Sequence, residues 1–188
     1  MRSNTRSTAW TVRAASTLLL VCTLVSVPSL AQVGYVTSPT ISANDLRKGC
    51  SIFFQKDFKY SDSDPLSSNI FNIQASWMCV GSQQIAIDRY EIEGSSPEIL
   101  TVLFWKHQRA VILVRWATSS QASDFQGDYY RVYVYDYRKN NVKKPFVGRN
   151  DIDKRFGEGW DGILNGKKIL YRYKDAKSIR SRLNKIGY

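Results

Sequence analysis

The chain has 188 residues, with 27 lysines and arginines against 16 acidic residues, so its formal net charge at pH 7 is +11. The excess of positive charge favours anionic partners such as an acidic protein, an envelope polymer, a lipid surface or nucleic acid, and it equally fits a protein kept dispersed by its charge. A single histidine and the absence of any phosphate-binding glycine loop argue against a zinc enzyme or a nucleotide enzyme.

Residues 1–31 have the pattern of a cleaved secretory signal peptide. Three arginines and no acid precede an apolar run, and Ser29-Leu30-Ala31 supplies the small residues that a signal peptidase reads. The apolar run is about 14 residues long, short of the ~20 needed to cross a bilayer, so cleavage is favoured over a membrane anchor. We therefore expect one mature, β-rich domain at residues 32–188, periplasmic or secreted, with a net charge of +8 and no transmembrane anchor.

Cys50 and Cys79 remain after cleavage, and an even count in an oxidising compartment predicts a disulfide rather than a metal site. Apolar residues alternate at 50–60 and at 71–79, which predicts two strands separated by a polar loop at 61–69. One antiparallel register joins both sulfurs and buries the apolar side chains; it pairs Cys50 with Cys79, Ile52 with Trp77, Phe54 with Ala75, and Phe58 with Phe71. A redox role is disfavoured because the cysteines form no Cys-x-x-Cys pair.

Residues 84–92 form the next predicted strand, and a hairpin of strands 99–105 and 110–116 follows, linked by the polar residues 106–109. We expect Trp105 to face Ala110, which sets the pairs Leu103 with Ile112, Thr101 with Val114, and Ile99 with Trp116. Both faces of this hairpin are apolar, so it belongs in the middle of a sheet that is covered on both sides.

The strand predicted at residues 129–137 separates its two faces, with one face made of Tyr130, Val132 and Val134 and the other of Tyr129, Arg131, Tyr133, Tyr135 and Tyr137. The tyrosine face could stack on sugars or bases, or bind a protein, because tyrosine and arginine are favoured at interfaces. The alternative is that neighbouring elements cover it, since aromatic residues are common in sheets. The preceding loop at 118–128 adds Asp124 and Phe125 as candidate binding residues.

A basic cluster follows at residues 138–149, with Arg138, Lys139, Lys143, Lys144 and Arg149 and no acid among them. We predict a turn at Asn140-Asn141 leading into a short edge strand that Pro145 stops. A brief helix at 150–156 would be capped by Asn150 or Asp151 and would pack through Ile152 and Phe156.

The last predicted elements are a hairpin and a helix. Asn165-Gly166 suits a type I′ turn between strands 160–164 and 167–171. Asp175 is a candidate cap for a terminal helix whose apolar face carries Ala176, Ile179, Leu183 and Ile186. The fold class is therefore α+β and mainly β, an antiparallel meander that is sandwich-like or small propeller-like, with one C-terminal helix packed on it.

Catalytic signals are weak throughout the sequence. His107 lies in a predicted turn with no neighbouring nucleophile or orienting acid, as a general base would need. A carboxylate-dependent hydrolase would draw on the acids around the strands, but sequence spacing alone does not bring them together; these are Asp88, Glu91, Glu93, Glu98, Asp124 and Asp128. We predict no catalytic residue, no metal and no cofactor.

The sequence thus favours a non-enzymatic exported protein that binds one protein partner through an acidic face of that partner, as an inhibitor or immunity protein for a toxin or an envelope-degrading enzyme would. The candidate surface combines the tyrosine face with Asp124, Phe125 and the basic cluster. The alternatives are a binding module for an anionic envelope polymer, peptidoglycan or lipopolysaccharide, and a small carboxylate-dependent hydrolase. Nucleic acid ranks below these because an exported protein seldom meets it.

Overall fold

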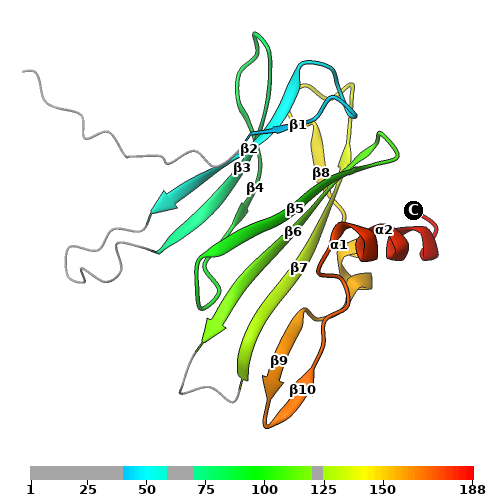
Figure 1. The fold of residues 1–188 in the computed structure, drawn as a ribbon. Helices are drawn as coiled ribbons and strands as arrows, with labels where there is room; N and C mark the ends of the chain where they lie inside the picture. The colour runs from blue at the N-terminus through cyan, green and yellow to red at the C-terminus, as the bar shows by residue number, and fades with distance from the viewer. Residues whose placement is uncertain (1–39, 59–69, 120–124) are drawn as a thin grey trace, which may run out of the picture. The chain divides into compact units, whose positions relative to one another are not determined.

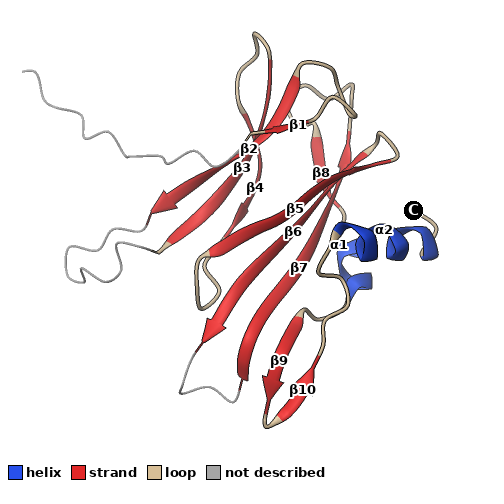
Figure 2. Cartoon of the chain, in the orientation of Figure 1, coloured by secondary structure: helices blue, strands red, loops and turns tan. Residues whose placement is uncertain are grey.

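The computed structural model describes residues 40–58, 70–119 and 125–188. The predicted signal peptide, the polar loop at 61–69 and Asp124 lie outside the described residues. In the described part of the chain, antiparallel strands dominate and the helices are short (Figures 1 and 2). None of the described helices combines the length and the apolar character that crossing a membrane requires.

The first sheet contains four strands in the order β1-β2-β3-β4. Their bounds are Ile41–Ser42 for β1, Cys50–Phe58 for β2, Phe71–Cys79 for β3 and Ile85–Tyr90 for β4. The predicted pairing of β2 with β3 is confirmed at every position, from Cys50 opposite Cys79 to Phe58 opposite Phe71. A disulfide joins the two cysteines across 29 positions of sequence.

The second sheet follows the order β10-β9-β7-β6-β5, and β8 also pairs with β7. Its strands are β5 (Pro97–Trp105), β6 (Arg109–Ser119), β7 (Phe125–Tyr137), β8 (Phe146–Gly148), β9 (Trp160–Leu164) and β10 (Lys167–Ile169). Every described pairing in both sheets is antiparallel, so the predicted meander is confirmed and is split between two sheets.

The register predicted for the β5–β6 hairpin is wrong by one residue. Trp105 pairs with Arg109 rather than Ala110, because Lys106 and His107 both adopt positive φ and close a tighter turn than the predicted one. A bulge between Ile99 and Thr101 then shifts the pairing again, so that Ile99 lies opposite Val114. A one-residue slip exchanges the faces of a strand, and the side chain of Leu103 therefore packs on the helix side of the sheet.

Two apolar cores lie on the two faces of the second sheet. The first joins the sheets, packing Ile52, Phe54 and Trp77 of the first sheet with Ile112, Trp116 and Tyr135 of the second. The second core lies beneath the helices α1 (Asn150–Asp153), η2 (Lys154–Phe156) and α2 (Ala176–Lys185). The central hairpin is therefore covered on both faces, as its apolar pattern predicts.

The carboxyl-terminal elements largely match their predicted positions. Asn165 and Gly166 both have positive φ, as a type I′ turn requires, and Asp175 caps α2 by accepting a hydrogen bond from the Ser178 N–H at 2.8 Å. Ile152 and Phe156 are buried, but the predicted cap of α1 is wrong, because Arg149 occupies the cap position without a side-chain hydrogen bond.

The predicted role of Pro145 is also wrong. The short strand β8 begins directly after this proline, so Pro145 precedes the strand instead of stopping one. The Pro145 carbonyl accepts a hydrogen bond from the Arg138 N–H at 2.7 Å, which closes the loop between β7 and β8.

Candidate functional site

Four connecting segments meet at the disulfide-bonded end of the two sheets. They are residues 43–49 before β2, 80–84 between β3 and β4, 106–108 between β5 and β6, and 138–145 between β7 and β8. We call this set the loop end; it lies at the top of Figure 1.

Hydrogen bonds hold the segments of the loop end together. The Val80 N–H donates to the Gly49 carbonyl at 3.0 Å. His107 Nδ1 lies 2.9 Å from the Asp45 carbonyl oxygen, and because a carbonyl only accepts, Nδ1 carries the proton. His107 therefore links the two sheets, which is a structural role. Among the described residues, neither a nucleophile nor an orienting acid is a hydrogen-bond partner of its side chain.

Positive charge concentrates on the loop end. Asp45 is the one acidic residue of its four segments, which carry seven cationic side chains: Arg47, Lys48, Lys106, Arg138, Lys139, Lys143 and Lys144. None of the seven forms an ion pair with another described residue. Their charges are therefore available to a partner.

The loop end also exposes apolar surface. Val80 is 91% exposed and Val142 is 72% exposed, more than any other large hydrophobic side chain in the described ranges. Both line a cavity of about 170 Å³ that three of the segments share, together with Arg47, Ser82, Lys139 and Asn141. Exposed apolar side chains ringed by charge are typical of protein interaction sites.

The loop at residues 138–145 is ordered by its own hydrogen bonds. Besides the bond between Arg138 and Pro145, the Asn141 N–H donates to the Arg138 carbonyl at 3.0 Å. The Asn141 side chain in turn accepts from the Lys144 N–H at 2.9 Å. A loop that is already ordered loses less entropy when it binds, so its four cations are presented at low cost.

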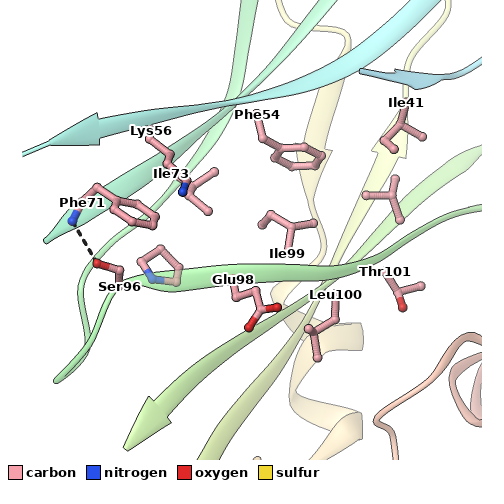
Figure 3. A pocket seen from close by; sticks show the side chains of 12 residues that line it. Ile41, Phe54, Lys56, Phe71, Ile73, Ser96, Glu98, Ile99, Leu100 and Thr101 are labelled. Atoms are coloured by element: carbon pink, nitrogen blue, oxygen red, sulfur yellow. Dashed lines mark hydrogen bonds between the residues drawn. The ribbon is translucent and has the colours of Figure 1, made fainter. Parts of the chain in front are cut away.

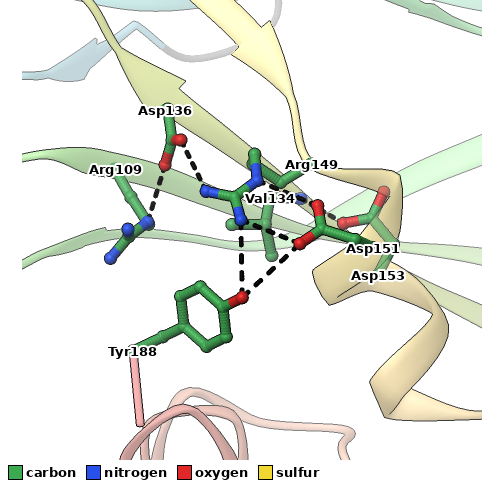
Figure 4. A network of polar contacts seen from close by, with 7 residues as sticks. All are labelled: Arg109, Val134, Asp136, Arg149, Asp151, Asp153 and Tyr188. Carbon is green, nitrogen blue, oxygen red and sulfur yellow. Dashed lines mark hydrogen bonds and ion pairs between the residues drawn. The ribbon is translucent and has the colours of Figure 1, made fainter. Parts of the chain in front are cut away.

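A polar network supports the base of this loop (Figure 4). Asp136 on β7 accepts from Arg109 and from Arg149, each at 2.7 Å. Arg149 also pairs with Asp151 at 2.8 Å, and this guanidinium lowers the pKa of the Asp151 carboxyl to about 2. The Tyr188 hydroxyl lies 3.4 Å from Arg149, so the network reaches the end of the chain.

The predicted tyrosine face points toward the first sheet. Tyr135 is 3% exposed, and its hydroxyl donates to the Asp88 carboxylate at 2.6 Å and lies 3.2 Å from the Tyr90 hydroxyl. Burial raises the pKa of Tyr135. The rings of Tyr133 and Tyr137 pack against the first sheet as well. This row therefore contributes mainly to the core between the sheets.

Three further candidates on β7, Phe125, Tyr129 and Arg131, are separated from the loop end. The Arg131 side chain is exposed and lies over the Tyr133 ring at 4.9 Å. Tyr129 packs against Trp160, and so does Phe125, which is 6% exposed. The structure thus brings Arg138, Lys139, Lys143 and Lys144 together. Tyr137 of the predicted tyrosine face lines the same loop-end cavity, whereas the other members of that face and Phe125 lie elsewhere.

Some of the candidate carboxylates do converge. Asp88, Glu91 and Glu93 line a polar cavity of about 310 Å³ together with Asp153, which the sequence did not single out. Burial raises the pKa of Asp153 to about 7. Its carboxylate accepts the Val134 N–H at 2.8 Å, and Asp88 accepts from Tyr135, so structural hydrogen bonds engage both groups.

Two other candidate acids, Glu98 and Asp128, have an ion-pair partner away from that cavity. Glu98 pairs with Arg115 across β5 and β6, and Asp128 lies 3.5 Å from the same guanidinium. Within the described ranges, no group of three or more histidine, cysteine, aspartate or glutamate residues is placed to hold a metal ion.

Comparison with known proteins supplies no relative for this chain. No protein-family model, no curated protein and no solved structure matches it.

Proposed function

We propose that this chain is an exported, non-enzymatic binding protein whose loop end recognises an acidic face of another protein, in the manner of an inhibitor or immunity protein. The observation that carries the proposal is the concentration of seven unpaired cations and the two most exposed valines on ordered segments. The Cys50–Cys79 disulfide supports export, because such bonds persist in oxidising compartments.

Recognition would combine electrostatic attraction of the partner with burial of apolar surface in the complex. A surface with uncompensated charges of one sign attracts a partner of opposite charge and raises the association rate, an effect that salt screens. The exposed Val80 and Val142 then supply apolar area at the cavity that they line together with Arg47 and Lys139. An apolar centre with a charged rim is the usual composition of a protein interface.

Capture from an envelope extract of the producing cells tests this proposal. The immobilised mature protein should retain one stoichiometric protein, and retention should weaken as salt rises from about 0.05 to 0.5 M. The charge-reversed variant Lys139→Glu/Lys144→Glu should lose that protein. The matched control Lys167→Glu/Lys168→Glu reverses two exposed charges on β10 and should keep it.

Two results would overturn the proposal. Equal capture by both variants would place the interface elsewhere. Failure to capture any protein, with retention on peptidoglycan or lipopolysaccharide instead, would favour a module for an anionic envelope polymer.

A second candidate function is a small carboxylate-dependent hydrolase, which the cavity lined by Asp88, Glu91, Glu93 and Asp153 favours. A carboxyl group with a pKa near neutrality suits a general acid. If this function holds, the purified protein releases soluble fragments from peptidoglycan, and the Glu91→Gln variant loses that activity without a change in melting temperature. The binding proposal predicts that the unsubstituted protein releases none.

A further inference from the structure

A groove of about 550 Å³ opens between the two sheets, on the side where β5 faces β2 and β3. Figure 3 shows Phe54 and Ile73 of the first sheet and Ile99 of β5 pointing toward one another across this groove. It shares no lining residue with the loop end or with the polar cavity. It is therefore a separate feature of the molecule.

The lining of the groove is mainly apolar. Besides Pro97, seven of its side chains are aliphatic or aromatic and come from both sheets: Ile41, Phe54, Phe71, Ile73, Ile99, Leu100 and Val102. Sites for small organic ligands are mostly apolar, carry a few polar groups and span about 300–1,000 Å³. The groove matches these properties in size and composition.

The edge of β5 is a poor template for an added peptide strand. β5 is the last strand of its sheet in the described pairing order, so one of its edges is unpaired, and its residues 97–102 line the groove. Pro97 has no N–H to donate, and the bulge between Ile99 and Thr101 interrupts the regular ladder. Prolines and bulges hinder the pairing of an added strand at a sheet edge. The groove therefore suits a flexible alkyl chain better than a peptide strand.

The charges at the rim favour an anionic group. Lys56 and Glu98 are the charged residues of the lining, and Arg115 already pairs with Glu98. Lys56 forms no ion pair with any described residue, and its Nζ lies 4.3 Å from the centroid of the Phe71 ring. The groove thus combines an apolar floor with one lysine that has no ion-pair partner in the described part of the chain.

We propose that the groove binds a long-chain fatty acid, with the alkyl chain among Phe54, Ile73 and Ile99 and the carboxylate at Lys56. The apolar lining removes the alkyl chain from water, and the lysine forms an ion pair with the carboxylate. An alcohol or an ester of the same length carries no charge and would not form this ion pair. This site does not depend on the function proposed for the loop end.

Titration of the mature protein with the fluorescent fatty acid cis-parinaric acid tests this proposal. We expect saturable binding at one site per chain. Hexadecanoic acid should displace the probe, whereas hexadecanol should compete about two- to five-fold less well, as the loss of one rim ion pair predicts. Lys56→Gln should weaken hexadecanoic acid by the same factor and abolish the discrimination against the alcohol.

Two further variants control this experiment. Lys168→Gln removes an exposed lysine on β10 and should leave binding unchanged. Ile99→Trp should fill the groove and weaken both the acid and the alcohol, and its melting temperature reports whether it folds. Absence of saturable binding, or an acid-to-alcohol preference that persists in Lys56→Gln, would overturn the proposal. Backbone shifts along β5 induced by an apolar peptide, but not by the fatty acid, would assign the groove to a peptide instead.

Discussion

Asp153 joins α1 to β7 by accepting the Val134 N–H, and its carboxyl is largely removed from water. Burial raises its pKa from 3.8 to about 7, so between these values the folded protein binds a proton more tightly than the unfolded chain. The stabilisation from this proton is complete below about pH 4 and is lost as the pH rises through about 7.

The Asp153→Asn variant should lack this pH dependence, because an amide keeps a hydrogen-bond acceptor but does not ionise. Between pH 4 and pH 7.5, we expect the free energy of unfolding of the unsubstituted protein to fall by about 1 to 2 kcal/mol more than that of the variant, after a discount for solvent screening. Urea denaturation at both pH values measures the difference. Parallel pH profiles would show that Asp153 is ionised in the folded protein throughout.

Gly159 is a position where the backbone of β7 leaves no room for a side chain. A Cβ at this position would lie 1.5 Å from the Tyr130 carbonyl oxygen, which is backbone and cannot move aside cheaply. Gly159→Ala should therefore push β9 from β7 and reduce the free energy of unfolding by about 1 to 3 kcal/mol. Gly148→Ala is the control, because its Cβ would meet no atom closer than 4.0 Å. Equal stability of the two variants would contradict the close approach.

At the scale of elements, the register of two strands could be predicted where the sequence of the strands allows only one good alignment. Two cysteines and matched apolar alternation allow one good alignment of β2 with β3, and the structure has it. The sequence of the β5–β6 hairpin does not fix its register, because both faces are apolar and a slip of one residue still places apolar side chains on each face. Lys106 is not a residue type that favours positive φ, and His107 favours it less distinctly than the glycine that usually marks such a turn, so the turn that fixes the register is hard to predict.

The disulfide that fixes the β2–β3 hairpin should contribute substantially to stability. Replacing both cysteines, as Cys50→Ala/Cys79→Ala, should reduce the free energy of unfolding by about 2 to 4 kcal/mol, chiefly because the unfolded chain regains the freedom that the cross-link removes. Chemical denaturation of the variant beside the unsubstituted protein, each without reductant, measures this. A variant as stable as the unsubstituted protein would show that the strand pairing needs no covalent support.

At the scale of the whole molecule, the candidate surface could be predicted only in part. The basic cluster at 138–149 is evident in the sequence. That it lies near Arg47, Lys48 and Lys106 depends on how the two sheets pack, which the sequence does not show. The sequence does carry one signal for this arrangement, because the pairing of Cys50 with Cys79 places residues 47–48 beside residues 80–82. The tyrosine row was visible too, but alternation gives the face of a strand and not what covers that face.

Site-specific photo-crosslinking tests the central claim, that the loop end is the binding surface, most directly. A benzoylphenylalanine at Val142 should form one covalent adduct with a protein of the envelope extract, and added salt should suppress it. The same group at Ile163 is the control, because Ile163 is 50% exposed but lies on β9, which pairs with the opposite end of β7. An adduct at Val142 and none at Ile163 is the predicted result; an adduct at Ile163 and none at Val142 would contradict it.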